Sequence, residues 1–144
     1  MTFGILATVC AGLFAGAAIY VSAVEHPARL SCGTALALRE FAPSYRRGTV
    51  MQASLAVIGL AASIAAWWHA GRVWFLVAGS LLGAVVPFTL LVILPTNRRL
   101  LAADLHADSA EAAALLRRWG WLHAIRSVLG TLAFAILIAC IAGR

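Results

Sequence analysis

The sequence contains no lysine and has few charged residues of any kind. Charged side chains make up 11% of its 144 residues, whereas soluble domains average about 25%. Hydrophobic residues make up 63%, which excludes an ordinary soluble domain. The net charge of +6 is carried by arginine alone. In so apolar a chain, arginines beside hydrophobic runs indicate membrane topology, and we do not expect nucleic acid as a partner.

Cysteine is scarce as well, and its three positions show no paired or metal-type spacing. Cys10 and Cys140 lie inside apolar runs, where we expect small packing residues. The sequence therefore predicts no disulfide framework. The first apolar run lacks a basic segment before it and is too long for the core of a signal peptide. We interpret it as a membrane span and not as a cleaved signal.

Four long apolar runs dominate the chain, approximately at 2–24, 50–68, 73–94 and 120–142. Each is close to the roughly 20 residues that cross a bilayer core as a helix. We predict an all-α integral membrane protein with one domain over residues 1–144. The expected fold is a four-transmembrane-helix bundle with short interfacial helices on the cytoplasmic side.

The connections between these spans carry their own signals. Residues 30–43 mix apolar and charged side chains and predict a short interfacial helix that ends at Pro43, with Ser44 capping the next helix. The tight turn 70–72 predicts an antiparallel hairpin of the second and third spans. Pro87 predicts a kink in the third span.

Before the fourth span, residues 100–118 are amphipathic. Asp108-Ser109-Ala110-Glu111 has the pattern of a capping box. We therefore expect a helix that begins near Ser109 and continues into the fourth span. The acidic residues of this region are expected to form a solvated face or to pair with nearby arginines.

Arginine is distributed unequally across the membrane. With Arg126 set aside, eight arginines lie in the connections after the first and third spans, and two lie on the other side. The eight are Arg29, Arg39, Arg46, Arg47, Arg98, Arg99, Arg117 and Arg118, and the two are Arg72 and Arg144. The positive-inside rule predicts that both arginine-rich loops are cytoplasmic and both termini external. The expected location is the inner (plasma) membrane.

Polar residues gather at the cytoplasmic ends of the spans. Trp119, His123 and Arg126 are spaced i, i+4 and i+7, so on a helix they share one face. Arg126 lies roughly 10 Å along the axis from Trp119, and a charge at that depth is costly without a partner. The other groups at this end are Glu25, His26, Arg29, Gln52, Asn97 and Trp121. An up-down bundle would place them around one cavity; interfacial anchoring with structural hydrogen bonds is the alternative.

Four motifs in order resemble a known family over nearly the whole chain. They are Gly12-x-x-x-Gly16-Ala17, Val24-Glu25-His26-Pro27-Ala28-Arg29, Leu94-Pro95-Thr96-Asn97-Arg98-Arg99-Leu100 and Arg118-Trp119-Gly120-Trp121-Leu122-His123-Ala124-Ile125-Arg126. The chain is similar to the uncharacterised-domain family of small four-span membrane proteins that includes anthrone oxygenases. This resemblance implies an oxidoreductase that oxidises a phenolic anthrone to an anthraquinone with dioxygen, without an added cofactor.

The resemblance carries over residues from three of the motifs. These are Glu25, His26, Pro27, Arg29, Asn97, Trp119, His123 and Arg126. Under this hypothesis His123 is the base that removes the acidic methylene proton. Arg126 and Asn97 stabilise the oxyanion, and Trp119 packs on the flat substrate.

The remaining groups take supporting roles in the same hypothesis. His26 with Glu25 forms a second acid–base pair, while Gln52, Arg29 and Trp121 contact the substrate. The expected partners are a small hydrophobic or aromatic substrate, dioxygen and membrane lipid.

Two alternative hypotheses involve the same residues. His26, His123 and Glu25 could bind copper, iron or zinc, or a histidine could ligate haem, which would make the chain a membrane redox protein. A third reading is a non-enzymatic structural or transport subunit. Gly12 and Gly16 allow close helix approach and suggest a homo-oligomer, although packing within the chain is favoured.

Overall fold

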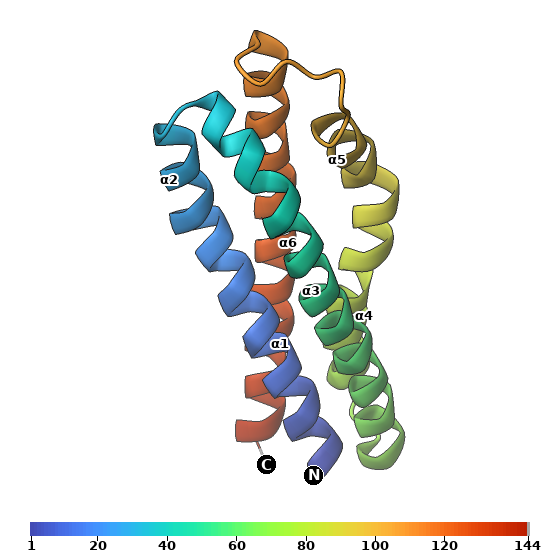
Figure 1. Ribbon diagram of the computed structural model, residues 1–144. Coiled ribbons are helices and arrows are strands. Elements are labelled where there is room, and N and C mark those ends of the chain that lie inside the picture. The colour runs from blue at the N-terminus through green and yellow to red at the C-terminus, as the bar shows by residue number, and fades with distance from the viewer. Residues whose placement is uncertain (144) are drawn as a thin grey trace.

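Four helical rods make up the protein. The computed structural model describes residues 1–143, and within that range every regular element is a helix (Figure 1). In order they are α1 (Thr2–Tyr20), η1 (Val21–Glu25), α2 (His26–Ser31), α3 (Thr34–Ala70), α4 (Val73–Phe88), η2 (Thr89–Ile93), α5 (Leu94–Leu100) and α6 (Ala110–Ala142). The rods Thr2–Ser31, Thr34–Ala70, Val73–Leu100 and Ala110–Ala142 are each long and apolar enough to cross a membrane. The predicted all-α membrane bundle is confirmed.

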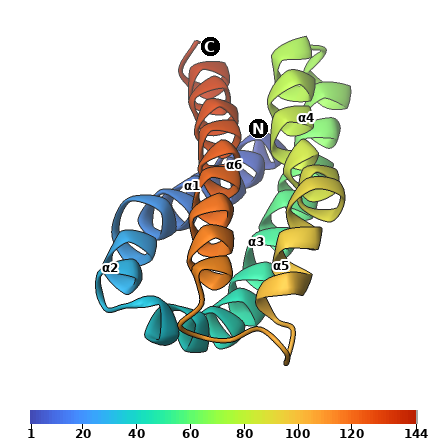
Figure 2. The ribbon, with the colours of Figure 1, turned by 90° about the horizontal axis from the view of Figure 1, so that it is seen from above.

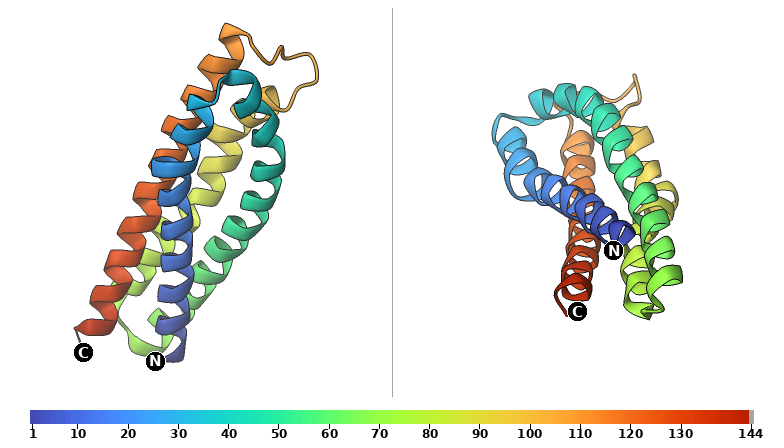
Figure 3. Two further views of the ribbon diagram at one scale, coloured as in Figure 1. Left: turned by 60° about the vertical axis from the view of Figure 1, so that its left-hand side comes forward. Right: turned by 90° about the horizontal axis from the view of Figure 1, so that it is seen from below.

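The rods form a ring in which each packs on its two neighbours. α1 contacts α3 and α6, and α4 contacts the same two helices from the opposite corner. The two described ends of the chain lie at one end of the bundle, and the α2–α3 and α5–α6 connections lie at the other (Figures 1 and 3). α1 and α4 are therefore diagonal, and the polar motifs that follow them come to the same end.

Glycines allow close packing of α1 against α6. A Cβ on Gly12 would stand 2.8 Å from the Phe134 ring of α6, and a Cβ on Gly130 of α6 would stand 2.6 Å from the Phe14 ring of α1. Each helix thus accepts a phenylalanine of the other, and van der Waals packing of this kind stabilises helix pairs in lipid. The space beside Gly12 is filled by Phe134 of the same chain, whereas nothing lies within 4 Å of a Cβ on Gly16. The homo-oligomer stays a prediction.

Two π-helical turns, η1 and η2, interrupt the diagonal rods at the polar end of the bundle. Each is followed, after one residue, by a proline: Pro27 after η1 and Pro95 after η2. Proline has no N–H to donate to the carbonyl four residues earlier, and a wider turn is one way for a helix to absorb that loss. Both turns contact α6. Pro87 stays inside α4, and the π-helical turn begins only at Thr89, ahead of Pro95. The kink expected near Pro87 stays a prediction.

The helix break expected at Pro43 does not occur. α3 is continuous from Thr34 to Ala70 with Pro43 inside it, and its N-cap is Gly33 with φ +94° rather than Ser44. Tertiary packing overrides the local signal, because Ala37 and Phe41 are buried in a cluster with Leu116 and Trp119 of α6. These contacts offset the one backbone hydrogen bond that proline removes. The first turns of α3 therefore lie across the end of the bundle (Figure 2).

The predicted hairpin of the second and third spans is confirmed. Gly71 ends α3 in the left-handed conformation, with φ +67°, and its N–H donates to the Trp67 carbonyl at 2.8 Å. Arg72 begins the next rod and donates to the Cys140 carbonyl near the end of α6 at 2.8 Å. The first contact closes the end of α3, and the second fixes the hairpin against the fourth rod. Arg144, which entered the charge asymmetry, lies outside the described residues.

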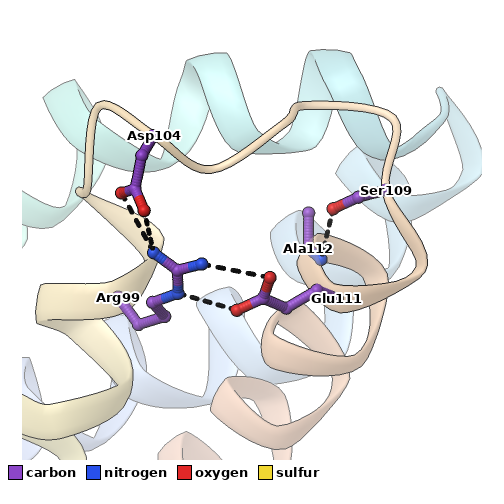
Figure 4. A network of polar contacts seen from close by, with 5 residues as sticks. All are labelled: Arg99, Asp104, Ser109, Glu111 and Ala112. Carbon is purple, nitrogen blue, oxygen red and sulfur yellow. Dashed lines mark hydrogen bonds and ion pairs between the residues drawn. The ribbon is translucent and has the colours of Figure 1, made fainter.

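The α5–α6 connection is tied down by one arginine (Figure 4). Arg99 donates to both carboxylate oxygens of Asp104, at 3.0 and 2.9 Å, and to Glu111 at 2.7 and 3.1 Å. This hydrogen-bonded guanidinium holds the pKa of the Asp104 carboxyl below its usual value. Ser109 caps α6 by accepting from the Ala112 N–H at 3.0 Å. The helix start near Ser109 is confirmed, but Glu111 binds Arg99 instead of closing a capping box.

Candidate functional site

A small buried cavity lies among η1, α2, α3 and α6 at the polar end of the bundle. Its volume is about 40 Å³, enough for a water-sized molecule. The polar and aromatic side chains that line it are Arg29, Phe41, Ser44, Tyr45, Thr49, Gln52, Trp119, His123 and Arg126. The three residues predicted to share one face of the fourth span therefore line one cavity.

His123 is held on two sides within this cavity wall. Its ring stacks on that of Trp119, with centroids 4.8 Å apart and planes 27° from parallel. Its Nδ1 atom lies 3.0 Å from the hydroxyl of Ser22 in η1. His123 is 3% exposed, and within residues 1–143 its Nε2 atom has no hydrogen-bond partner. One ring nitrogen is thus used by the protein and the other is left for a ligand.

Ser22 connects His123 to a second buried hydroxyl. The Ser22 Oγ lies 2.8 Å from the Oγ of Ser127, which also lies 2.9 Å from the Ala18 carbonyl oxygen. Ser127 lies one turn after His123 and contacts that residue's carbonyl oxygen at 3.3 Å. The contacts join α1, η1 and α6 through polar groups inside an apolar bundle, where interhelical hydrogen bonds of this kind are worth about 1–2 kcal/mol.

Arg126 faces a neutral partner. Its guanidinium donates to the Gln52 Oε1 of α3 at 2.8 Å and lies 5.7 Å from the centroid of the Phe14 ring. Because arginine has only donors, the amide oxygen must face it, which fixes the amide N–H₂ on the other side. Arg126 has no carboxylate partner among the described residues. Its charge is therefore available to an anionic group in the cavity.

Arg29 has a different environment. It pairs with Glu25 one turn earlier and with Glu40 of α3, whose Oε2 lies 2.9 Å from the arginine Nε. Ser44 donates to Glu25 at 3.0 Å, and the guanidinium lies 5.8 Å from the Trp119 ring centroid. With two carboxylates on one guanidinium, the charge of Arg29 is already compensated. Its clearest role is to fix α2 against α3.

His26 and Glu25 are adjacent in sequence but lie on different sides of their rod. Glu25 borders the groove between α1 and α3, whereas His26 borders a groove between α2 and α6. The His26 ring packs on Trp119, with centroids 5.1 Å apart, and its ring nitrogens have no partner within residues 1–143. The structure does not bring the two into the predicted acid–base pair.

Two further predicted residues lie away from the cavity. Trp121 is 78% exposed and borders the outer groove beside His26. Asn97 of α5 is 1% exposed and its side-chain oxygen and nitrogen lack partners within residues 1–143. It borders none of the cavities described here. The structure thus brings together Trp119, His123, Arg126, Gln52 and Arg29, and leaves Trp121 and Asn97 apart.

Two larger hollows adjoin the cavity. A groove of about 470 Å³ between α1 and α3 shares Val21, Ser44, Gly48 and Gln52 with it. A smaller pocket of about 80 Å³ between α3 and α4 shares Thr49, Gln52 and Arg126. The Gln52–Arg126 pair therefore stands between the two hollows.

The described residues do not form a metal centre made of several protein ligands. Among residues 1–143, no three His, Cys, Asp or Glu side chains come together so that they could hold a metal ion. Glu25 is held by Arg29 and Ser44, and His26 and His123 line different cavities. Among residues 1–143, Glu25, His26 and His123 therefore do not form a shared metal site, whereas haem ligation by a single histidine stays a prediction.

Sequence reasoning missed Ser22, Ser127, Glu40 and the aromatic pair of Phe41 and Tyr45. Ser127 lies at i+4 from His123, so its helical position already placed it on the same face. Phe41 lies in the segment 30–43 that was predicted to be interfacial, and Tyr45 lies just after it. Their rings stack 5.7 Å apart beside the cavity. Ser22 had no signal in the sequence, because its orientation depends on the π-helical turn.

These features define a class of protein, a four-helix membrane bundle with a polar cavity buried at one end. The family model for anthrone oxygenase matches residues 41–136. Anthrone oxygenase tpcL from Aspergillus fumigatus (strain ATCC MYA-4609 / CBS 101355 / FGSC A1100 / Af293) is 32% identical over 132 residues, covering 85% of this chain and 82% of that protein. The chain belongs to the anthrone oxygenase family, which is a family of oxygenase enzymes.

A second relative is similar over a shorter stretch. Anthrone oxygenase nsrD from Aspergillus novofumigatus (strain IBT 16806) is 33% identical over 104 residues, which cover 63% of this chain and 62% of that protein. No solved structure matches the chain. The family resemblance inferred from the four motifs is confirmed.

Proposed function

We propose that this chain oxidises an anthrone-type phenolic or other lipid-soluble aromatic substrate with dioxygen at the cavity beside His123. The observation that carries the proposal is the shared position of His123 and Arg126. Both line one buried cavity, with His123 Nε2 unpartnered within residues 1–143 and Arg126 facing only a neutral amide. A base and a cation that line the same cavity suit a reaction that passes through an enolate.

The first step is removal of a proton from the substrate. An anthrone carries an acidic methylene opposite its carbonyl, and His123 Nε2 takes one of these protons as general base. Negative charge then develops on the substrate oxygen. Arg126 donates to that oxygen, because its charge is not compensated by a carboxylate. Gln52 orients the guanidinium through the 2.8 Å hydrogen bond.

Dioxygen then reacts with the electron-rich carbon. Electron transfer from the enolate and recombination form a carbon–oxygen bond, and the resulting peroxide takes the proton from His123. Loss of the second methylene proton to His123 then forms the carbonyl and breaks the oxygen–oxygen bond. The departing hydroxide takes that proton back from His123 and leaves as water. The sum is anthrone plus dioxygen giving anthraquinone plus water, in which the substrate supplies all four electrons. The proposal requires no added cofactor.

Substrate binding needs more room than the cavity offers at rest. Ligand pockets for drug-sized molecules measure roughly 300–1,000 Å³, against about 40 Å³ for the cavity and about 470 Å³ for the adjoining groove. The ring system would therefore lie mainly in the α1–α3 groove, with its reacting edge at His123. Tyr20 and Met51 line this groove and are exposed on the bundle surface. A lipid-soluble substrate would enter from the bilayer between α1 and α3.

The same proposal includes an orientation. The eight arginines at the cavity end lie on the side that the positive-inside rule makes cytoplasmic. The cavity would then open near the cytoplasmic face of the inner (plasma) membrane, with both termini external. Cysteine labelling from either side of intact cells tests this orientation. Labelling of a His106→Cys variant by a reagent added outside the cell would contradict this orientation.

The activity is tested with the purified chain in lipid nanodiscs, given an anthrone under ¹⁸O₂. We expect quinone formation above the rate of protein-free oxidation, one ¹⁸O in each quinone, and the same rate after metal chelation. A rate equal to that of protein-free nanodiscs would contradict the oxygenase. Loss of activity on chelation, with recovery on adding one metal, would contradict the cofactor-free reaction alone.

A further inference from the structure

We propose that Ser22 and Ser127 are positioning residues that hold His123 as the Nδ1–H tautomer, with the Nε2 lone pair directed to the substrate. This inference rests on the proposed function for its catalytic meaning. The hydrogen-bond assignment itself rests only on the geometry of three side chains and one carbonyl. Neither serine lines the His123 cavity, so each acts through His123.

The direction of donation along this series of hydrogen bonds follows from the contacts of Ser127. Each serine hydroxyl carries one hydrogen. The Ser127 Oγ lies 2.9 Å from the Ala18 carbonyl oxygen and 3.3 Å from the His123 carbonyl oxygen, and both are acceptors only. The Ser127 hydrogen must therefore point to a carbonyl. Otherwise two oxygen atoms 2.9 Å apart would face each other without a hydrogen between them.

The two remaining contacts are then fixed in turn. Because the Ser127 hydrogen is used, the 2.8 Å contact between the serines needs the hydrogen of Ser22. Ser22 then has none left for the ring, so the 3.0 Å contact with His123 needs a hydrogen on Nδ1. The order of donation is His123 to Ser22, Ser22 to Ser127, and Ser127 to the Ala18 carbonyl. A neutral imidazole with hydrogen on Nδ1 has its lone pair on Nε2.

The same arrangement suits the ring after it has taken a proton. A protonated His123 still donates from Nδ1, so Ser22 accepts in both states and no hydroxyl has to turn. This series of hydrogen bonds is thus preorganised for a base that gains and returns a proton at Nε2. With the Nε2–H tautomer, the nitrogen facing the cavity would be a donor and could not remove a proton.

Local backbone structure places the two hydroxyls. Ser22 lies in the π-helical turn η1, five residues before Pro27. Ser127 lies one helical turn after His123, on the face of α6 turned to α1. The π-helical turn that precedes Pro27 thereby places Ser22 against His123, and this contact is visible only in the folded structure.

Nitrogen-15 NMR of histidine-labelled protein in nanodiscs tests the assignment without any substrate. A His123→Asn variant identifies the His123 signals by their loss. We expect a protonated, pyrrole-type Nδ1 and an unprotonated, pyridine-type Nε2 in the wild-type chain. The opposite pattern, or an equal mixture of tautomers, would overturn the proposal.

Variants then test whether the serines cause this preference. In Ser22→Ala and in Ser127→Ala the His123 signals should move toward a mixture of tautomers, and threonine at either position should restore them in part. Ser54→Ala removes an exposed hydroxyl that bonds its own helix and should leave the spectrum unchanged. Unchanged His123 signals in both alanine variants would overturn the positioning role.

Kinetics separate this inference from the proposed function. We expect Ser22→Ala to lower kcat by roughly five- to hundred-fold, the range for one buried hydrogen bond, with KM little changed. A raised KM with unchanged kcat would overturn the role in positioning the base. A wild-type chain that shows the Nδ1–H tautomer but oxidises no anthrone would contradict the proposed function while supporting the hydrogen-bond assignment.

Discussion

Gly120 of α6 lies directly against the ring of His26 on the first rod. A Cβ on Gly120 would stand 2.6 Å from His26 Nε2 and 2.7 Å from its Cδ2. This contact lets α2 and α6 approach closely, and the rings of His26 and His123 both pack on Trp119. A glycine is therefore favoured on steric grounds between the two tryptophans of the last motif, because a Cβ there would collide with His26.

A Gly120→Ala variant should therefore move His26 and destabilise the bundle. Overpacking of this kind costs about 1–3 kcal/mol, which should appear as a lower thermal midpoint in detergent. Gly16→Ala is the matched control, since nothing lies within 4 Å of its added Cβ and alanine favours a helix. Equal thermal midpoints in the two variants would contradict the close contact.

The Gln52–Arg126 pair should behave as one unit. Gln52→Leu keeps the side-chain size but leaves a buried guanidinium without its acceptor, and Arg126→Met removes the charge that needs one. We expect Gln52→Leu to cost about 1–3 kcal/mol of stability and to cost less when Arg126→Met is already present. A double-mutant cycle measures this coupling. Additive effects would show that the two side chains do not depend on each other.

Gly48 should control access to His123. It lines both the cavity and the α1–α3 groove, and nothing lies within 4 Å of a Cβ at this position. Gly48→Leu would fill that space while favouring the helix, so stability should hold or rise as KM for the aromatic substrate increases. Gly16→Leu places the same side chain on the outer face of α1 as a control. Full activity in Gly48→Leu would contradict the proposed route.

The Arg99–Asp104 contact should respond to acid. The pKa of Asp104 is lowered from its ordinary value of 3.8 by its hydrogen bonds with Arg99. A lowered pKa means that the contact is complete above the ordinary value and is lost as pH falls through the lowered one. Hydrogen exchange in residues 101–109 should therefore be constant between pH 5 and 7 after correction for intrinsic rates. Asp104→Asn should raise exchange there at neutral pH, and unchanged exchange would contradict the contact.

The membrane bundle could be predicted because composition and run length act over many residues at once. Pro43 shows where a local rule failed. The break expected there was outweighed by Ala37 and Phe41, whose burial against α6 depends on the complete fold. The start of α6 was predicted correctly because its Ser109 cap is a local signal, whereas the cap predicted at Ser44 lies inside α3.

The candidate site was predictable where its residues share one helix. Trp119, His123 and Arg126 follow helical spacing and do line one cavity. Residues drawn from other helices were harder, because depth in the membrane does not fix direction around a helix. Glu25 and His26 lie at the right depth and face different grooves. Ser22 was invisible to spacing rules, since it is oriented by a π-helical turn.

The role of His123 as the base is the central claim, and chemical rescue tests it most directly. In nanodiscs with an anthrone and air, His123→Ala should lose roughly 10²- to 10⁴-fold in rate above the protein-free background, the usual range for a general base. Added imidazole should restore part of that rate. His106→Ala, which removes an exposed loop histidine, should keep the wild-type rate. A His123→Ala variant that oxidises the anthrone as fast as the wild type would contradict the account.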